Sequence, residues 1–172
     1  MYLPTAHQIA VLDENIFNIY SKDMELLQQL SIKNRKEKIL AFALNMAVYR
    51  PGSGMQSHTD QIVVTTNDKR LYIFNSSVTE RGIYFEQDMS FCFNDLPFKM
   101  YQIYWDNDRI YCGGKEGFLV VNKSGQTLIS YKYDMSRLKA TFGRQLPLMA
   151  VNRNRCLVQT KKREKAKFLV EG

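Results

Sequence analysis

The chain has 172 residues, the length of one ordinary domain, and its 45% hydrophobic and 12% aromatic content is enough for a packed core. Disordered chains lack this apolar content, and no apolar run approaches the roughly 20 residues that a membrane-spanning helix requires. The N-terminal stretch has no basic segment before a long apolar one, so it does not match a signal peptide, and we expect a cytoplasmic protein.

The first elements are three short predicted strands between residues 7 and 31, at Gln8–Leu12, Ile16–Tyr20 and Leu26–Ile32. Alternation in the second of these puts Phe17 and Ile19 on one face, opposite Ile16, Asn18 and Tyr20. We expect most of a four-stranded sheet here, without its first strand.

A long apolar run follows at Lys38–Tyr49. Its composition fits either a helix or the buried innermost strand of a sheet, and the neighbouring strands favour the second. The segment 50–60, with Pro51, Gly52 and Gly54, is predicted to be a loop. Further strands are expected at Gln61–Thr66, Leu71–Phe74 and Gly82–Phe85, the last with a possible extension to Phe93.

The clearest four-strand pattern lies between residues 99 and 133. Its strands are predicted at 99–105, 109–113, 118–122 and 127–133, separated by the turn sequences 106–108, 115–117 and 123–125. The segment 134–142 fits either a short helical turn or a loop. Three more strands are expected at Pro147–Val151, Arg155–Thr160 and Phe168–Val170.

One pattern occurs four times along the chain, starting at Gln8, Gln61, Arg109 and Arg155. Each copy is a polar residue, an alternating strand, a short turn and a second alternating strand, and the copies recur about every 50 residues, a period typical of β-propellers. We therefore predict an all-β fold, a partial β-propeller of about three and a half four-stranded antiparallel blades. The predicted blades are 7–37, 38–95, 96–134 and 145–172, within one incomplete domain spanning 1–172. Because an open ring exposes apolar blade faces, we expect this chain to be part of a larger propeller.

Basic residues account for the net charge of +7, and many of them gather in two clusters. Both clusters fit solvated turns between strands, or alternatively a surface that attracts anionic lipid or an acidic protein. Nucleic acid is not expected, because no aromatic residues are interleaved with the basic ones. The clusters are Lys33, Arg35, Lys36 and Lys38, and Lys161, Lys162, Arg163, Lys165 and Lys167.

No pattern in the chain predicts catalysis, a metal site or a cofactor. His7 and His58 do not lie at ligand spacing from a cysteine or from each other. Gly113, Gly114 and Gly117 belong to a strand–turn–strand context, which lacks the helix N-terminus of a phosphate-binding loop. We name no catalytic, cofactor-binding or metal-binding residue, leave the binding residues unknown, and expect no enzyme activity.

The remaining candidates have structural explanations. Cys92, Cys112 and Cys156 are widely spaced and are expected to be buried, unreactive thiols rather than partners of His58. Asp106 and Asp108 are expected to form a turn rather than an acid–base pair. Trp105 is expected to pack in the core rather than to anchor a partner.

The order of these segments resembles the citron-homology domain, a propeller-type domain with degenerate repeats. The resemblance is carried by DQIVVTTNDKRLYIFN, YQIYWDNDRIYCGGKEGFLVVNKSGQTLISY and LPLMAVNRNRCLVQTKKREKAKFLVEG, together with the segment starting at Glu14. Within the family, the chain is most similar to the N-terminal domains of HOPS and CORVET vacuolar sorting tethering subunits and of the TGF-beta receptor-associated protein. We expect the helical solenoid that follows the propeller in tethering subunits to lie outside this sequence.

The resemblance implies a non-enzymatic protein-interaction domain in vesicle-mediated protein transport. Its implied partners are other tethering-complex subunits, Rab-type small GTPases and receptor tails, with peripheral contact to an anionic endosome, lysosome or vacuole membrane. Blade-connecting loops such as 50–60 and 134–146 would provide the contacts. The alternative is a citron-homology domain of a kinase or exchange factor that binds Rho-type small GTPases.

Overall fold

Consecutive strands pair antiparallel, and their order in each sheet follows their order in the chain. The computed structural model describes residues 2–3, 8–13, 16–32, 36–45, 60–79, 82–133, 149–152, 155–159 and 165–169. The first sheet contains β1 (Tyr2–Leu3), β2 (Gln8–Asp13), β3 (Ile16–Tyr20) and β4 (Leu26–Ser31). The second contains β5 (Ile39–Leu44), β6 (Gln61–Thr66), β7 (Leu71–Thr79) and β8 (Gly82–Phe93).

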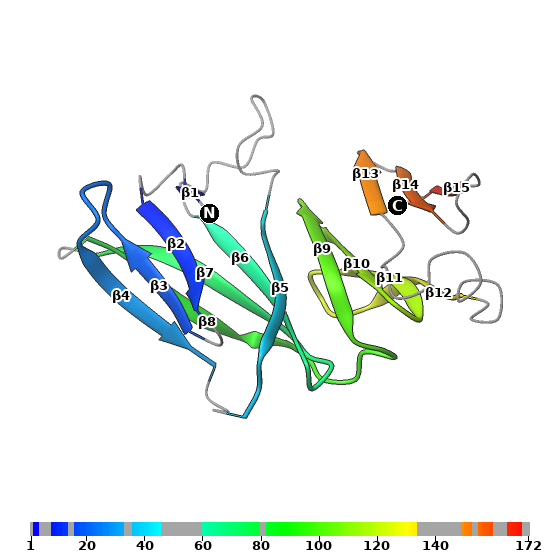
Figure 1. Cartoon of the computed structure of the whole chain (residues 1–172), viewed down its shortest axis with the longest axis horizontal. Helices are drawn as coiled ribbons and strands as arrows, with labels where there is room; N and C mark the ends of the chain where they lie inside the picture. Colours follow the sequence, from blue (N-terminus) through cyan, green and yellow to red (C-terminus); the bar gives the residue numbers. More distant parts are fainter. Residues whose placement is uncertain are drawn as a thin grey trace.

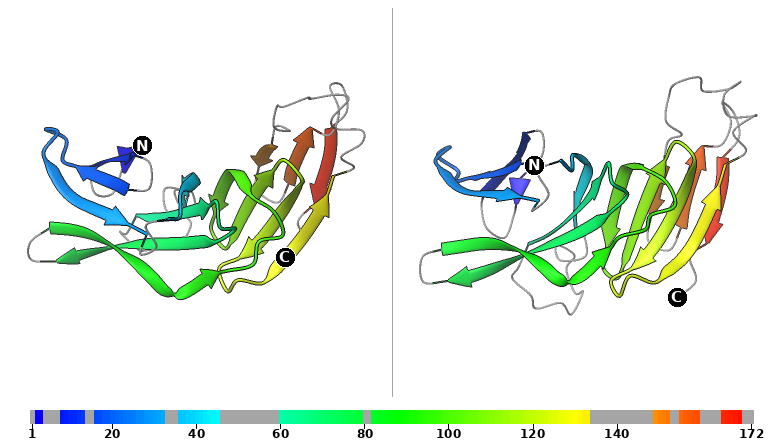
Figure 2. Two further views of the ribbon diagram at one scale, coloured as in Figure 1. Left: turned by 60° about the horizontal axis from the view of Figure 1, so that its bottom comes forward. Right: turned by 90° about the horizontal axis from the view of Figure 1, so that it is seen from below.

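The third sheet contains β9 (Met100–Asp106), β10 (Arg109–Gly114), β11 (Gly117–Asn122) and β12 (Thr127–Lys132). The last sheet has three described strands, β13 (Met149–Asn152), β14 (Arg155–Gln159) and β15 (Lys165–Leu169). The sheets follow one another along the molecule from blue to red (Figures 1 and 2). This succession of antiparallel sheets confirms the predicted all-β, propeller-type fold.

The central strands β6 and β7 of the second sheet are buried on both faces because their residues alternate between two cores. On β6, Ile62 and Val64 belong to the core shared with the first sheet, and Val63 between them belongs to the core shared with the third. On β7, Phe74 belongs to the core shared with the first sheet, and Ile73 belongs to the core shared with the third. Burying each such side chain contributes about 1.5–3 kcal/mol, so the face-to-face contacts between sheets hold the fold together.

The four sequence copies are the second and third strands of the four sheets. The first apolar residue of each copy pairs with an equivalent position on the following strand. The equivalent pairs are Ile9 with Tyr20, Ile62 with Phe74, Ile110 with Val121, and Cys156 with Phe168. The repeat in the sequence is therefore a repeat of one β-hairpin at one place in each sheet.

Two details differ from the sequence-based expectation. The first sheet does have a first strand, β1, which pairs Tyr2 with Ile9 and Leu3 with Gln8. A strand of two residues is too short for its alternation to be recognised in a sequence. The expected extension of the Gly82 strand is confirmed, because β8 runs to Phe93. Its pairing with β7 shifts register between Tyr72 and Phe74.

The long apolar run is a strand, as favoured, but it is not the most buried one. All residues of β5 except Ile39 are half-buried, whereas β6 is buried from Ile62 to Thr66. The first strand of the second sheet, β5, therefore carries apolar side chains that are only half-buried. The proposed loop 50–60, apart from Asp60, and the segments 134–142 and 134–146 lie outside the described residues.

Candidate functional site

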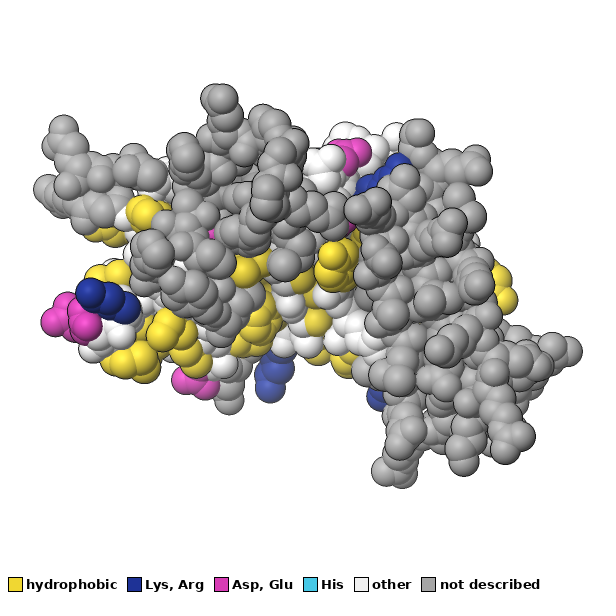
Figure 3. Space-filling view, turned by 90° about the horizontal axis from the view of Figure 1, so that it is seen from above, with side chains coloured by type: hydrophobic (Ala, Val, Ile, Leu, Met, Phe, Trp, Pro, Cys, Tyr) yellow, Lys and Arg dark blue, Asp and Glu magenta, His cyan; other side chains and the backbone are white. Residues whose placement is uncertain are grey.

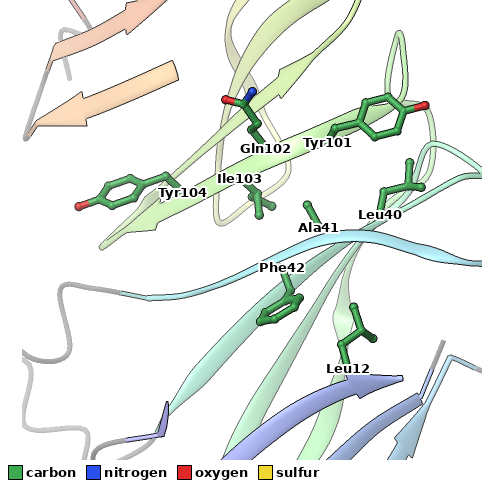
Figure 4. Close-up of a pocket in the computed structure, with 8 residues that line it drawn as sticks. All are labelled: Leu12, Leu40, Ala41, Phe42, Tyr101, Gln102, Ile103 and Tyr104. Atoms are coloured by element: carbon green, nitrogen blue, oxygen red, sulfur yellow. The ribbon is translucent and has the colours of Figure 1, made fainter. Parts of the chain in front are cut away.

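The open space beside β5 is a groove between the first strands of the second and third sheets (Figure 4). β5 and β9 run in the same direction and meet at one end, where Asn45 and Trp105 form a parallel bridge. The groove has a volume of about 530 Å³ and also borders β2. It is lined by Leu12, Leu40, Ala41, Phe42, Tyr101, Gln102, Ile103 and Tyr104, and we call it the inner-strand groove.

The lining of the inner-strand groove is mainly apolar, and every lining residue is half-buried. Ala41 and Ile103 lie between the two strands, while Phe42 is directed towards Leu12 on β2 (Figure 4). The Phe42 ring also packs edge-on against Phe17, with ring centroids 5.2 Å apart. The groove floor is thus continuous with the hydrophobic core of the first two sheets.

A buried hydroxyl fixes β9 beside the second sheet. Thr65 Oγ1 donates a hydrogen bond to the Met100 carbonyl over 3.1 Å, and both residues are fully buried. Thr65 therefore joins β6 to the start of β9, and the position of the third sheet does not depend on apolar contacts alone.

The end of the groove where β5 and β9 begin is rich in lysine. Lys38 and Lys99 directly precede the two strands, and Lys115 Nζ lies 5.3 Å from the centre of the Tyr101 ring. All three lysines are exposed. Backbone hydrogen bonds bring residues 67 and 69 to the same end, through Asn67 to Lys38 and through Leu96 to Lys69. The segments that meet here, 36–38, 67–70, 95–99 and 115–116, carry six basic and four acidic side chains.

One of those acidic side chains is already neutralised. Glu37 is fully buried and accepts hydrogen bonds from Arg70 Nη1 at 2.5 Å and from the Tyr72 hydroxyl at 2.9 Å. Burial raises the pKa of Tyr72, so this phenol stays protonated and continues to donate. The hydrogen bond with Tyr72 and the charge of Glu37 raise the pKa of Arg70.

A directional chain of side-chain amides lies at the opposite end, where β5 and β9 finish. The Asn107 backbone N–H donates to Asn45 Oδ1 at 2.9 Å, and Asn45 Nδ2 donates to Gln61 Oε1 at 2.9 Å. Gln61 Nε2 then donates to Asn75 Oδ1 at 3.0 Å, and Asn75 Nδ2 donates to Asp88 Oδ2 at 3.1 Å. The chain crosses the whole second sheet and anchors it to the first turn of the third.

A carboxylate ends this amide chain. Asp88 Oδ1 accepts hydrogen bonds from the Ser90 hydroxyl at 2.5 Å and from the Ser90 N–H at 2.9 Å. The hydroxyl contact is the main reason why the pKa of Asp88 lies below its ordinary value. An ionised carboxylate can only accept hydrogen bonds. Each amide in the chain donates to the next residue, so the chain ends at Asp88.

Charged side chains of both signs lie near this end of the described structure. Asp60 and Asp106 are buried, whereas Asp108 is exposed and Arg109 and Lys123 are half-buried. The exposed lysines are therefore a feature of the end where β5 and β9 begin.

Several residues singled out from the sequence occupy the expected structural places. Trp105 is fully buried, and its indole Nε1 donates to the Asn107 carbonyl at 3.0 Å. Cys112 is a buried free thiol on β10 whose pKa is raised by burial. Asn107, with a φ of 55°, forms the expected turn between Asp106 and Asp108.

The glycines at 113, 114 and 117 lie on β10 and β11 around the expected hairpin turn. A side chain at Gly114 would lie 2.5 Å from the Lys99 carbonyl, so this glycine permits a close approach of the two strands. Close packing against residues 98 and 99, and against Tyr131, accounts for Gly114 and Gly117.

Other expectations fall where the structure describes no side chain. His7, His58, Lys33, Arg35 and residues 161–164 lie outside the described residues, and nothing is described for the side chains of Cys92, Cys156, Lys165 and Lys167. Lys36 and Lys38 of the first basic cluster are exposed. Within the described residues, no three histidine, cysteine, aspartate or glutamate side chains are grouped to hold a metal ion.

No helix in the described part of the chain is long and apolar enough to cross a membrane.

The sequence did not point to the inner-strand groove or to the amide chain. The lining residues belong mainly to two strands some 60 residues apart with no motif between them. The amides lie on or beside three different strands, and only tertiary pairing brings them together.

Comparison with known proteins gives little beyond the fold. No family model and no curated protein matches the chain. One matching solved structure is the crystal structure of BBS1N in complex with ARL6DN, soaked with lead, with 11% sequence identity and a TM-score of 0.33. The match covers 92% of this chain and 63% of that chain, so this chain spans less than two thirds of it. At this TM-score the likeness carries no argument about function.

Proposed function

We propose that this chain is a non-enzymatic protein-interaction domain of the propeller type. The observation that carries this proposal is the inner-strand groove, a half-buried surface between two sheets with five apolar and three polar lining residues. Among the described residues that line it there is no acid, histidine, cysteine or lysine; two tyrosine hydroxyls and one amide are their polar side-chain groups. Such a lining suits the recognition of another polypeptide better than proton transfer or nucleophilic attack.

The finer proposal is a role in endolysosomal or vacuolar vesicle tethering. It is supported by the resemblance of the ordered segments to citron-homology domains, especially those of HOPS and CORVET subunits. The domain would act at the cytoplasmic side of endosome, lysosome or vacuole membranes and contact tethering-complex subunits, Rab-type small GTPases or receptor tails. The exposed Lys36 and Lys38 would add a weak attraction to anionic lipid.

The alternative is a citron-homology domain that serves a kinase or exchange factor and binds Rho-type small GTPases. Both versions use the fold as a rigid scaffold, and they differ in the partner. Affinity capture with the full-length parent protein separates them, using lysate loaded with non-hydrolysable GTP or with GDP and mass spectrometry as the readout.

Recovery of tethering subunits, with a Rab enriched in the GTP sample, is the expected result. Recovery of Rho-type GTPases or cytoskeletal proteins would favour the alternative. Equal recovery of a GTPase in both nucleotide states would reject GTP-dependent recognition. Absence of any protein partner from both samples would reject the interaction function itself.

A further inference from the structure

We propose that the inner-strand groove binds an extended segment of a partner protein in which apolar side chains are followed by acidic residues at one end. The acidic end would lie beside Lys38, Lys99 and Lys115. This proposal rests on the proposed protein-interaction function and names the surface and the kind of partner sequence that it would recognise.

The groove is suited to an extended chain because both of its walls are edge strands. β5 and β9 each lie at the edge of their own sheet and meet in the parallel bridge between Asn45 and Trp105. At the bridge the strands have the spacing of about 5 Å of directly paired strands, so a partner lies over the groove and not between the strands. An extended segment can lie along this surface and direct alternate side chains into the groove.

The middle of the groove selects apolar side chains. Ala41 and Ile103 lie between the strands, and Leu12 and Phe42 continue the apolar surface towards the first sheet (Figure 4). All four are half-buried and would lose water contact when a partner covers them. The space-filling view of the top of the molecule likewise shows hydrophobic side chains in the described middle region and charged side chains towards its margins (Figure 3).

Charge gives the bound segment a direction. The end where the strands begin carries six basic and four acidic side chains, and Arg70 already neutralises the buried Glu37 among them. At the other end Asp60 and Asp106 are buried, and the exposed Asp108 is followed directly by Arg109. An acidic terminus of the partner segment is therefore attracted to the end that carries Lys99 and Lys115.

Fluorescence anisotropy with purified full-length chain tests this. The probes are two fluorescein-labelled nine-residue peptides, each with three acidic residues and six residues that alternate leucine with threonine. One probe carries the acidic residues at its N-terminus and the other at its C-terminus, because the groove alone does not fix the chain direction. Companion peptides carry lysine in place of the acidic residues.

The variants separate charge from the apolar floor. The double variant K99E/K115E reverses two lysines at the basic end, and Ile103→Arg fills the groove. Lys132→Glu on the outer strand β12 is the charge control; it reverses one lysine instead of two, at an exposed position outside the groove lining. Circular dichroism and thermal melting of each variant check that the fold is intact; the surface variant K99E/K115E keeps the test valid if Ile103→Arg does not fold.

The expected result is binding of one acidic probe at least tenfold tighter than its lysine companion. K99E/K115E should weaken it about fivefold to tenfold, K132E should leave it within about twofold, and raised salt should weaken it. Equal binding of acidic and lysine probes, equal effects of K99E/K115E and K132E, or no binding of any probe would overturn the proposal.

Self-association offers another outcome. If sedimentation shows a dimer of the wild-type chain that Ile103→Arg dissolves, the groove is occupied by a second copy and the proposal is wrong. Failure of the peptide test with successful affinity capture would reject the groove as the binding surface while leaving the interaction function standing. Failure of both would reject the function as well.

Discussion

Asn45 and Asn107 join the second and third sheets through two reciprocal hydrogen bonds. The Asn107 N–H donates to Asn45 Oδ1 at 2.9 Å, and Asn45 Nδ2 donates to the Asn107 carbonyl at 3.3 Å as well as to Gln61. Asn45 is fully buried, directly follows β5 and forms the parallel bridge to Trp105. One side chain therefore belongs to the amide chain and joins two sheets.

Replacing Asn45 with alanine should reduce the free energy of unfolding by about 1–3 kcal/mol, because buried partners lose their hydrogen bonds. Urea unfolding monitored by the fluorescence of the single tryptophan, Trp105, measures the change. Asn18→Ala is the matched control. It removes an amide pair with Gln29 at 2.9 Å in an exposed setting and should cost about 0.5 kcal/mol or less. Equal losses in the two variants would contradict the role given to Asn45.

Asp88 predicts a specific dependence of stability on acid. Its folded-state pKa is lowered, chiefly by the Ser90 hydroxyl, so its contribution is present above its ordinary pKa of 3.8. That contribution is lost as the pH falls from about 4 through the lower folded value, where the carboxylate becomes protonated. Urea unfolding of D88N should therefore show a shallower decline than wild type below about pH 4. Ser90→Ala, which removes the hydroxyl that lowers the pKa of Asp88, should share the shallower decline. A wild-type slope in D88N would refute the assignment.

Gly117 should not tolerate a side chain. A Cβ there would overlap the Phe98 ring and the Tyr131 backbone carbonyl, and backbone atoms cannot move aside as a flexible side chain can. Gly117→Ala should lower the unfolding free energy by about 3 kcal/mol, from overpacking. Gly125→Ala is the comparison: its φ is 80° but the nearest atom, on Phe93, is 3.7 Å away, so only the backbone cost of about 1 kcal/mol applies. A larger loss for Gly125→Ala would reverse the expected order.

Cys112 should resist alkylation as long as the protein is folded. Its thiol is fully buried and burial raises its pKa, so the reactive thiolate is scarce at pH 8. Incubation with iodoacetamide, followed by peptide mass spectrometry, should find Cys112 unmodified in buffer and modified in 6 M guanidinium chloride. Rapid modification of Cys112 in buffer would show that the packing of β10 against the second sheet is looser than described.

The hairpins of the fold could be predicted from the sequence, because alternation and turn residues are local properties. The copies starting at Gln61 and Arg109 place their strands correctly, and Trp105 and Cys112 are buried as expected. β1 could not be predicted, because its two residues are held by pairing with β2 rather than by their own pattern.

The candidate site required the structure. β5 was expected to be a buried innermost strand because Leu40, Ala41 and Phe42 are apolar, yet these residues line a groove opposite Ile103. Apolar composition does not distinguish a core from an apolar binding surface, since both consist of the same residue types. The pairing of β5 with β9 is a tertiary contact that no local signal encodes.

The measurement that tests the central claim most directly is site-specific photocrosslinking in cells that contain the full-length parent protein. A benzoyl-phenylalanine replaces Tyr101 in the groove, or Lys132 on the outer strand as the control position. If the groove is the partner-binding surface, position 101 will crosslink to a protein segment with apolar and acidic residues, and position 132 will not. Crosslinks to the same partner from position 132, with none from position 101, would contradict the account.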